Sequence, residues 1–183
     1  MTTLLWVAAA ALILAVIVLY NRLVQARNQV RSAWSDIDVQ LTRRHDLVPR
    51  LVTAVQAYAD YERATLTAVT ELRKASQAAA HLPDKAQLED QMADGLHRLI
   101  ALAEAYPDLK ADGNFLELQR ELTSIEDQLQ YARRFYNGAV RILNTRIESF
   151  PDLLLARPLN FAPAEFFAVA GEETRLAPRV ELN

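Results

Sequence analysis

Residues 4–20, LLWVAAAALILAVIVLY, form an apolar run that is too uniform to be one face of a soluble helix. No residue before Arg22 carries a charged side chain. A helix of about 20 residues is about 30 Å long, which matches the hydrocarbon thickness of a bilayer. Trp6 and Tyr20 lie near the ends of the run, where aromatic rings prefer the membrane interface. The sequence therefore predicts a transmembrane anchor over residues 1–21.

A secretory signal peptide or a buried core helix would also be apolar at this position. A signal peptide normally has Lys or Arg before its apolar core and small residues at a cleavage site after it. Residues 1–6 contain neither Lys nor Arg, and the apolar core runs directly into Tyr20, Asn21 and Arg22. A core helix does not need such a long unbroken apolar run. A retained anchor is the better interpretation.

Basic residues follow the anchor and none precedes it. Arg22, Arg27 and Arg31 come before the first acid, which is Asp36. The positive-inside rule then predicts that the amino terminus lies outside the cell membrane and that the rest of the chain is cytoplasmic. The reverse orientation would make the chain an extracytoplasmic bundle.

Beyond the anchor, the composition favours helices. The chain has only 4 glycines in 183 residues and is rich in alanine, leucine, glutamate, glutamine and arginine. Valine and isoleucine occur mostly at helical spacing, so we expect no sheet. Prolines divide the chain into long proline-free windows, each able to hold a helix. The fold class that follows is all-α.

Helix ends are predicted from prolines and capping residues. The anchor helix should continue out of the membrane and end near Arg44 or His45. Asp46 would cap the second helix, with Pro49 in its first turn. The capping-box pairs that start the third and fourth helices are Asp84 with Gln87, and Asn114 with Glu117.

The fourth helix, ending at Phe150, has apolar residues three and four apart through five heptads, as in a coiled coil. Such a seam must pack on other helices, and short connections make neighbouring helices antiparallel. We therefore predict a long up-down-up-down helical bundle over residues 22–150. An extended, proline-containing tail over residues 151–183 would either pack along the bundle or lie at the membrane surface. Packing, which would bury Phe166 and Phe167, is favoured because the tail has few basic residues.

Three segments resemble a known family. AWSDIDVQLTRRHDLVPRLV, residues 33–52, closely resembles the signature of the LemA family of bacterial membrane proteins. The similarity resumes in NFLELQRELTSIEDQLQYARRFYN, residues 114–137, and in NFAPAEFF, residues 160–167. The resemblance implies a single amino-terminal span, a helical-bundle domain and no established catalytic activity. Some members of that family are linked to magnetosome membrane formation, and others are associated with membrane stress and proteolysis, so the resemblance implies a role at a membrane without naming its biochemistry.

The sequence offers few residues in patterns that bind metals or phosphate or carry out catalysis. A bundle di-metal site needs two Glu-x-x-His units, but among the three histidines only His97 has an acid three residues earlier, Asp94. The absence of cysteine argues against structural zinc, and the isolated glycines form no phosphate loop. With 20 basic and 23 acidic residues and no basic patch, nucleic acid is not expected as a partner. We predict no catalytic residue, no cofactor and no metal.

Two groups of polar residues are candidate sites. Those of the first helix either fix helix register through interhelical hydrogen bonds and ion pairs, or form a docking patch anchored by Trp34 or an arginine. This first group is Trp34, Asp36, Asp38, Gln40, Arg43 and Arg44. The second group, of candidate interhelical polar residues on the fourth helix, is Asn114, Gln119, Glu126, Arg133 and Asn137.

The function expected from these features is a single-pass, non-enzymatic scaffold or adaptor that organises a protein assembly at a bacterial cell membrane. Its expected partners are the lipid bilayer, further copies of itself and an unknown membrane protein. A membrane-remodelling or tethering module is the alternative. An extracytoplasmic sensory bundle is a third candidate, which requires the reverse orientation.

Overall fold

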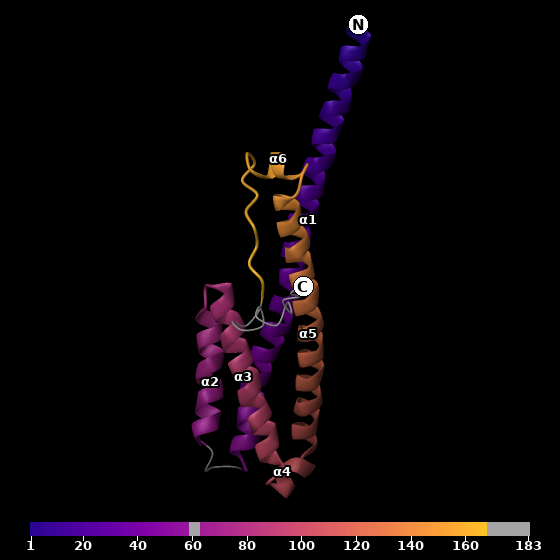
Figure 1. The fold of residues 1–183 in the computed structure, drawn as a ribbon. Helices are drawn as coiled ribbons and strands as arrows, with labels where there is room; N and C mark the ends of the chain where they lie inside the picture. The colour runs from indigo at the N-terminus through magenta and orange to yellow at the C-terminus, as the bar shows by residue number, and fades with distance from the viewer. Residues whose placement is uncertain (59–62, 168–183) are drawn as a thin grey trace, which may run out of the picture. The chain divides into compact units, whose positions relative to one another are not determined.

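The computed structural model describes residues 1–58 and 63–167, and in these ranges the chain is helical with no strand. This confirms the all-α fold class. The helices are α1 (Thr2–Gln56), α2 (Arg63–Ala78), α3 (Leu82–Ala103), α4 (Pro107–Ala111), α5 (Gly113–Glu148) and α6 (Leu153–Ala156), shown in Figure 1. The part of the predicted tail beyond residue 167 lies outside the described residues.

The chain divides into two compact units, and the long helices α1 and α5 contribute to both. The first unit contains residues 1–37 and 132–165. Of the described residues, the second unit contains 38–58, 63–131 and 166–167.

The sequence predicted that the first helix ends near Arg44 or His45, but α1 continues through Pro49 to Gln56. Proline inside a helix removes a backbone hydrogen bond and costs about 3 kcal/mol. The turns on both sides of Pro49 carry buried side chains, including Leu47 and Leu51, each only 1% exposed. Burying one such side chain contributes about 1.5–3 kcal/mol, so packing on both sides offsets the proline. The sequence prediction assigned proline too much weight against the apolar stripe.

The predicted capping boxes are also wrong. Helix α3 begins one residue before Pro83, and its N-cap, His81, makes no side-chain capping hydrogen bond. Helix α5 is capped by Asp112, whose Oδ1 accepts a hydrogen bond from the Phe115 amide at 2.8 Å. Asn114 therefore lies inside the first turn of α5 rather than at its cap.

The second unit is a bundle built from the carboxy-terminal part of α1, then α2 and α3, and the amino-terminal part of α5. Figure 1 shows α2 and α3 side by side and antiparallel. The heptad seam of α5 faces this core as expected. The core residues, from all four helices and from α4, are Leu47, Val48, Leu51, Val55, Leu66, Val69, Met92, Leu96, Leu99, Ala103, Leu109, Phe115, Leu118, Leu122 and Ile125.

In the first unit, α1 packs against the end of α5. Trp34 and Tyr136 contact each other edge to face, with ring centroids 5.7 Å apart. The seam of α5 continues as the buried residues Tyr136, Ala139, Leu143 and Ile147, whereas Phe150 is 79% exposed.

The sequence predicted no helix after α5, but the chain forms the short helix α6 there before it returns along α1 and α5. Phe161 packs edge to face on Tyr20, with ring centroids 6.4 Å apart. The Arg27 guanidinium lies over the same Phe161 ring, 5.0 Å from its centroid. Asn144 binds the backbone of Ala164 through two hydrogen bonds of 2.9 Å, which hold residues 161–165 as a strap on the first unit.

The two phenylalanines at the end of the described tail belong to the second unit. Phe167 is buried, at 3% exposed, while Phe166 remains 37% exposed. Packing of the tail is therefore seen for Phe161 and Phe167, and only in part for Phe166.

Candidate functional site

Charged residues occupy core positions in the second unit. Arg44 continues the apolar series of α1 that includes Ile37, Leu41 and Leu51, and is only 1% exposed. Glu89 lies in the buried series of α3, between Ala86 and Met92, and is 0% exposed. A helix that folds by burying one stripe must bury every residue on that stripe, including a charged one. Arg44 and Glu89 are therefore forced into the core and need partners there.

The two buried charges pair with each other. Arg44 Nη1 donates to Glu89 Oε2 at 3.0 Å and to the Glu89 carbonyl oxygen at 3.1 Å. Arg44 Nη2 donates to Glu126 Oε1 at 2.5 Å. The other carboxylate oxygen of Glu89, Oε1, accepts from Ser76 Oγ and lies 2.6 Å from His45 Nε2. Every helix of this bundle contributes: Arg44 and His45 from α1, Ser76 from α2, Glu89 from α3 and Glu126 from α5.

The electrostatics of this cluster keep Glu89 ionised. Burial raises the pKa of Glu89, but hydrogen bonds from His45 and Ser76 and the charge of Arg44 outweigh burial and hold the pKa below its ordinary value. Both carboxylate oxygens act as acceptors for donors on other helices. The cluster is therefore suited to fix the relative register of four helices, which is a structural role rather than a catalytic one.

The first group of predicted residues is not brought together. Trp34 belongs to the first unit, on Tyr136, whereas Asp38, Gln40, Arg43 and Arg44 belong to the second. Of these four, only Arg44 joins the buried cluster.

The other members of the first group lie at or near the surface. Arg43 donates to Gln128 Oε1 on α5 at 3.3 Å. Asp36 is exposed, and Gln40 is half-buried. Asp38 lines a small cavity of about 240 Å³ beside His45 and Lys85.

The second group is also divided. Glu126 joins the cluster through Arg44. Asn114 is exposed in the first turn of α5, and Gln119 is half-buried. Arg133 and Asn137 are half-buried in the first unit.

Three cluster residues were missed by the sequence prediction: His45, Ser76 and Glu89. The signal was present for two of them, because Glu89 and Ser76 fall at positions where the spacing of their helices calls for an apolar residue. Ser76 lies seven residues after buried Val69 on α2.

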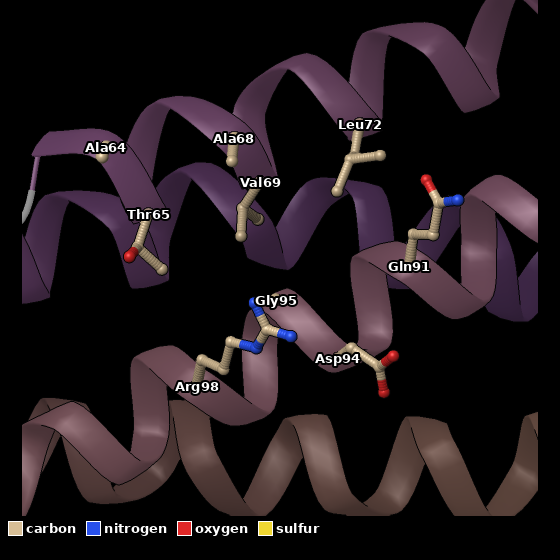
Figure 2. A pocket seen from close by; sticks show the side chains of 9 residues that line it. All are labelled: Ala64, Thr65, Ala68, Val69, Leu72, Gln91, Asp94, Gly95 and Arg98. Carbon is tan, nitrogen blue, oxygen red and sulfur yellow. The ribbon is translucent and has the colours of Figure 1, made fainter.

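A surface groove of about 410 Å³ runs between α2 and α3 (Figure 2). Apolar side chains of α2 form one wall, and polar side chains of α3 form the other. Two of the latter, Asp94 and Arg98, are exposed, lie one helical turn apart and form no ion pair with any described residue. The lining residues are Ala64, Thr65, Ala68, Val69, Leu72, Gln91, Asp94, Gly95 and Arg98.

Helices α2 and α3 approach closely at Gly95, which lines the groove. A Cβ atom placed on Gly95 would lie 2.7 Å from Val69 Cγ2, which is closer than packed carbon atoms allow. Ala64 and Ala68, on the neighbouring face of α2, have small side chains that project little from the helix. A helix laid over this face could therefore come close to the backbone.

Comparison with known proteins finds a family and several relatives that this chain resembles. The sequence pattern of the LemA family matches residues 33–182. Protein LemA of Metamycoplasma hominis is 26% identical over 148 residues, which cover 80% of this chain and 68% of that protein. Magnetosome protein MamQ 2 of Paramagnetospirillum magneticum is 24% identical over 201 residues, covering 94% and 74%. Magnetosome protein MamQ of Magnetospirillum gryphiswaldense is 24% identical over 198 residues, covering 93% and 73%. None of these names describes an enzyme.

Proposed function

Because the chain belongs to the LemA family, we propose that it is a membrane-anchored, non-enzymatic scaffold whose helical bundle associates with further copies of itself at a bacterial cell membrane. Two of the similar proteins are named magnetosome proteins, and this similarity is in keeping with the proposed association with a membrane.

Helix α1 is the observation that carries this proposal. It contains a segment that is long and apolar enough to cross a membrane, and the side chains of that segment are not buried within the structure. The same helix continues without a break to Gln56, and from Leu23 onward it buries one stripe. The proposed anchor and the bundle are therefore joined by continuous helix, with no loop between them. Such a connection suits a scaffold that presents its bundle from the lipid.

The proposed orientation rests on the arginines that follow the apolar segment. Arg22 and Arg31 are exposed, and Arg27 is half-buried against Phe161. These residues would favour the cytoplasmic face of the membrane.

The surface we assign to self-association is the groove between α2 and α3. Two α3 helices packed antiparallel, with a two-fold axis midway between Asp94 and Arg98 on their exposed face, would place Asp94 of each copy beside Arg98 of the other. Opposite charges one turn apart are self-complementary in this arrangement. The low, alanine-lined face of α2 would let the copies approach closely, and a second copy would supply the partners that Asp94 and Arg98 lack among the described residues.

Charge reversal tests this arrangement. Asp94→Arg would place arginine opposite arginine in both pairs, and Arg98→Asp would place acid opposite acid. The double variant D94R/R98D restores opposite charges across the axis. Inverting two exposed pairs changes the association free energy by about 1–2 kcal/mol, so each single variant should associate roughly tenfold more weakly. The measurement is energy transfer between labelled copies in phosphatidylcholine vesicles at increasing lipid-to-protein ratio.

The exposed pair of Glu71 and Lys74 on α2, 2.9 Å apart, provides the matched control. Reversing either charge there should leave association unchanged. Wild-type association in D94R or R98D, or failure of the double variant to recover, contradicts the proposed interface. A monomeric wild-type protein in vesicles contradicts self-association altogether.

A further inference from the structure

Large apolar side chains are exposed on the loop that follows α5. This loop, residues 149–160, includes α6 and is called the α6 loop below. Phe150 is 79% exposed, Leu154 is 62% exposed and Leu159 is 48% exposed. Single exposed apolar residues are common on protein surfaces, but three large ones on one short loop indicate a contact with lipid or protein.

The α6 loop is folded, so these side chains are held outward by its own structure. Asp152 is buried and forms an ion pair with Arg146, with Nη1 and Oδ2 3.4 Å apart. Ala156 is 0% exposed, and its carbonyl accepts a hydrogen bond from the Phe161 amide at 3.0 Å. Asp152 and Ala156 thus face inward, and Leu154, which lies between them in the sequence, faces outward.

The height of the loop along α1 follows from the antiparallel packing of α1 and α5 in the first unit. Trp34 contacts Tyr136. Fourteen residues toward the amino terminus of α1 is Tyr20, and fourteen residues along the chain from Tyr136 is Phe150. At 1.5 Å per residue, Tyr20 lies about 21 Å from Trp34 along α1, and Glu148, the last residue of α5, lies about 18 Å from Tyr136. The end of α5, two residues before Phe150, therefore lies within about 3 Å of the level of Tyr20. The direct contact between Tyr20 and Phe161 supports this level independently.

Tyr20 marks the end of the apolar segment of α1. Residues 2–20, as a helix, span about 28 Å, close to the hydrocarbon thickness of a bilayer. Figure 1 shows α6 beside α1, with the amino-terminal part of α1 extending beyond it. The exposed apolar side chains of the α6 loop therefore lie where the membrane interface would be if α1 spans a bilayer.

We infer that the α6 loop inserts Phe150, Leu154 and Leu159 into the lipid interface beside α1, as a second membrane contact of the same chain. This inference rests on the proposed span. Arg22, just after the apolar segment of α1, and Arg157, in the α6 loop, are both exposed and could pair with anionic headgroups. Two contacts with one leaflet would fix the tilt and rotation of the first unit, which a single helix leaves free.

Single cysteines can report the depth of the loop, because the chain contains no cysteine. Full-length Leu154→Cys is labelled with an environment-sensitive fluorophore and reconstituted in vesicles of phosphatidylcholine and phosphatidylglycerol. Lipids brominated near the headgroup or near the chain ends serve as quenchers. Leu12→Cys, in the middle of the proposed span, and Gln77→Cys, exposed on α2, are the matched controls.

The inference predicts that the label at position 154 emits at shorter wavelength than the label at position 77. It also predicts that shallow bromines quench position 154 more strongly than deep ones, whereas position 12 shows the opposite order. If position 12 is quenched by deep bromines but position 154 behaves like position 77, the inference is wrong and the proposed span stands. If position 12 is not quenched, the span itself is wrong.

A protein partner covering the loop gives a different result. The label at position 154 would then be shielded without quenching by either lipid, and its shielding would depend on protein concentration in the vesicles. That outcome overturns the lipid contact. Phe150→Glu and Leu159→Glu should leave the helical content unchanged, because both side chains already face outward, but should reduce the shift and quenching at position 154.

Discussion

Replacing Glu89 by glutamine tests the proposed locking role of the buried cluster. Glu89 uses one oxygen to accept from Arg44, and the other to accept from Ser76 with His45 Nε2 beside it. Glutamine has the same shape but only one acceptor oxygen, and its NH₂ group would face one of these donors. Glu89→Gln therefore removes one of the two carboxylate charges that compensate Arg44 in the core, and it forces the hydrogen bonds around position 89 to rearrange.

The expected loss is large for one isosteric change. Removing one partner of a buried ion pair costs about 3–5 kcal/mol. Glu126 remains 2.5 Å from Arg44 in the variant and keeps part of the compensation, so the lower end of the range applies. A loss of about 3 kcal/mol in a chain of this size lowers the unfolding midpoint by about 6–12 °C.

The assay is thermal and urea unfolding of the full-length protein in detergent, followed by circular dichroism. Glu71→Gln is the control, because Glu71 forms an exposed ion pair with Lys74 and both side chains are 62% exposed. That exposed pair contributes at most about 1 kcal/mol. Arg44→Met combined with Glu89→Met should recover much of the loss, since an apolar pair of similar volume removes both buried charges.

A midpoint for Glu89→Gln within about 1 °C of the wild type would refute the reasoning. It would mean that the cluster is solvated in solution, or that its charges are compensated in some other way.

Four further outcomes follow from the structure. Because the pKa of Glu89 is lower in the folded state, its stabilising contribution is present above its ordinary pKa of 4.5 and is lost as the pH falls through the lower folded value. The free energy of unfolding of the wild type should therefore fall steeply with pH in this acid range, and that of Glu89→Gln should depend less on pH. Gly95→Ala should destabilise the α2–α3 contact by about 1–2 kcal/mol through overpacking against Val69, and Val69→Ala should relieve that loss in the double variant, as a urea midpoint would report. Asn144→Ala breaks both hydrogen bonds to Ala164 and should release the strap, making residues 161–165 cleavable under limited proteolysis while the wild type resists. Protease added to right-side-out vesicles should leave residues 22–183 intact and should degrade them in inside-out vesicles; the opposite pattern favours the extracytoplasmic arrangement.

Long-range periodicity made most of the helices predictable. The heptads of α5 are read directly from the sequence, and all seam residues from Phe115 to Leu129 are buried. Helix ends were less predictable because they depend on competition between local and tertiary terms. Pro49 is a strong local breaker, yet the buried residues on both sides keep α1 helical. The acid that caps α5 is Asp112, two residues before the residue expected from the capping pattern.

The candidate site was only partly predictable. Arg44 and Glu126 were identified, but the second acid that pairs with Arg44, Glu89, is on a third helix. Which acid meets which arginine depends on the relative register of packed helices, and no local sequence term sets that register. Glu89 nevertheless carried a detectable signal, since an acid at a core-spaced position of an amphipathic helix requires a buried partner.

We expect lipid to hold the amino-terminal part of α1, so that the bundle is presented from a membrane. Alkaline carbonate extraction of native membranes is the decisive experiment, because it strips proteins held by charge or by other proteins and retains those that span the lipid. The intact chain should stay in the membrane pellet. Release of the intact chain into the supernatant would contradict this expectation.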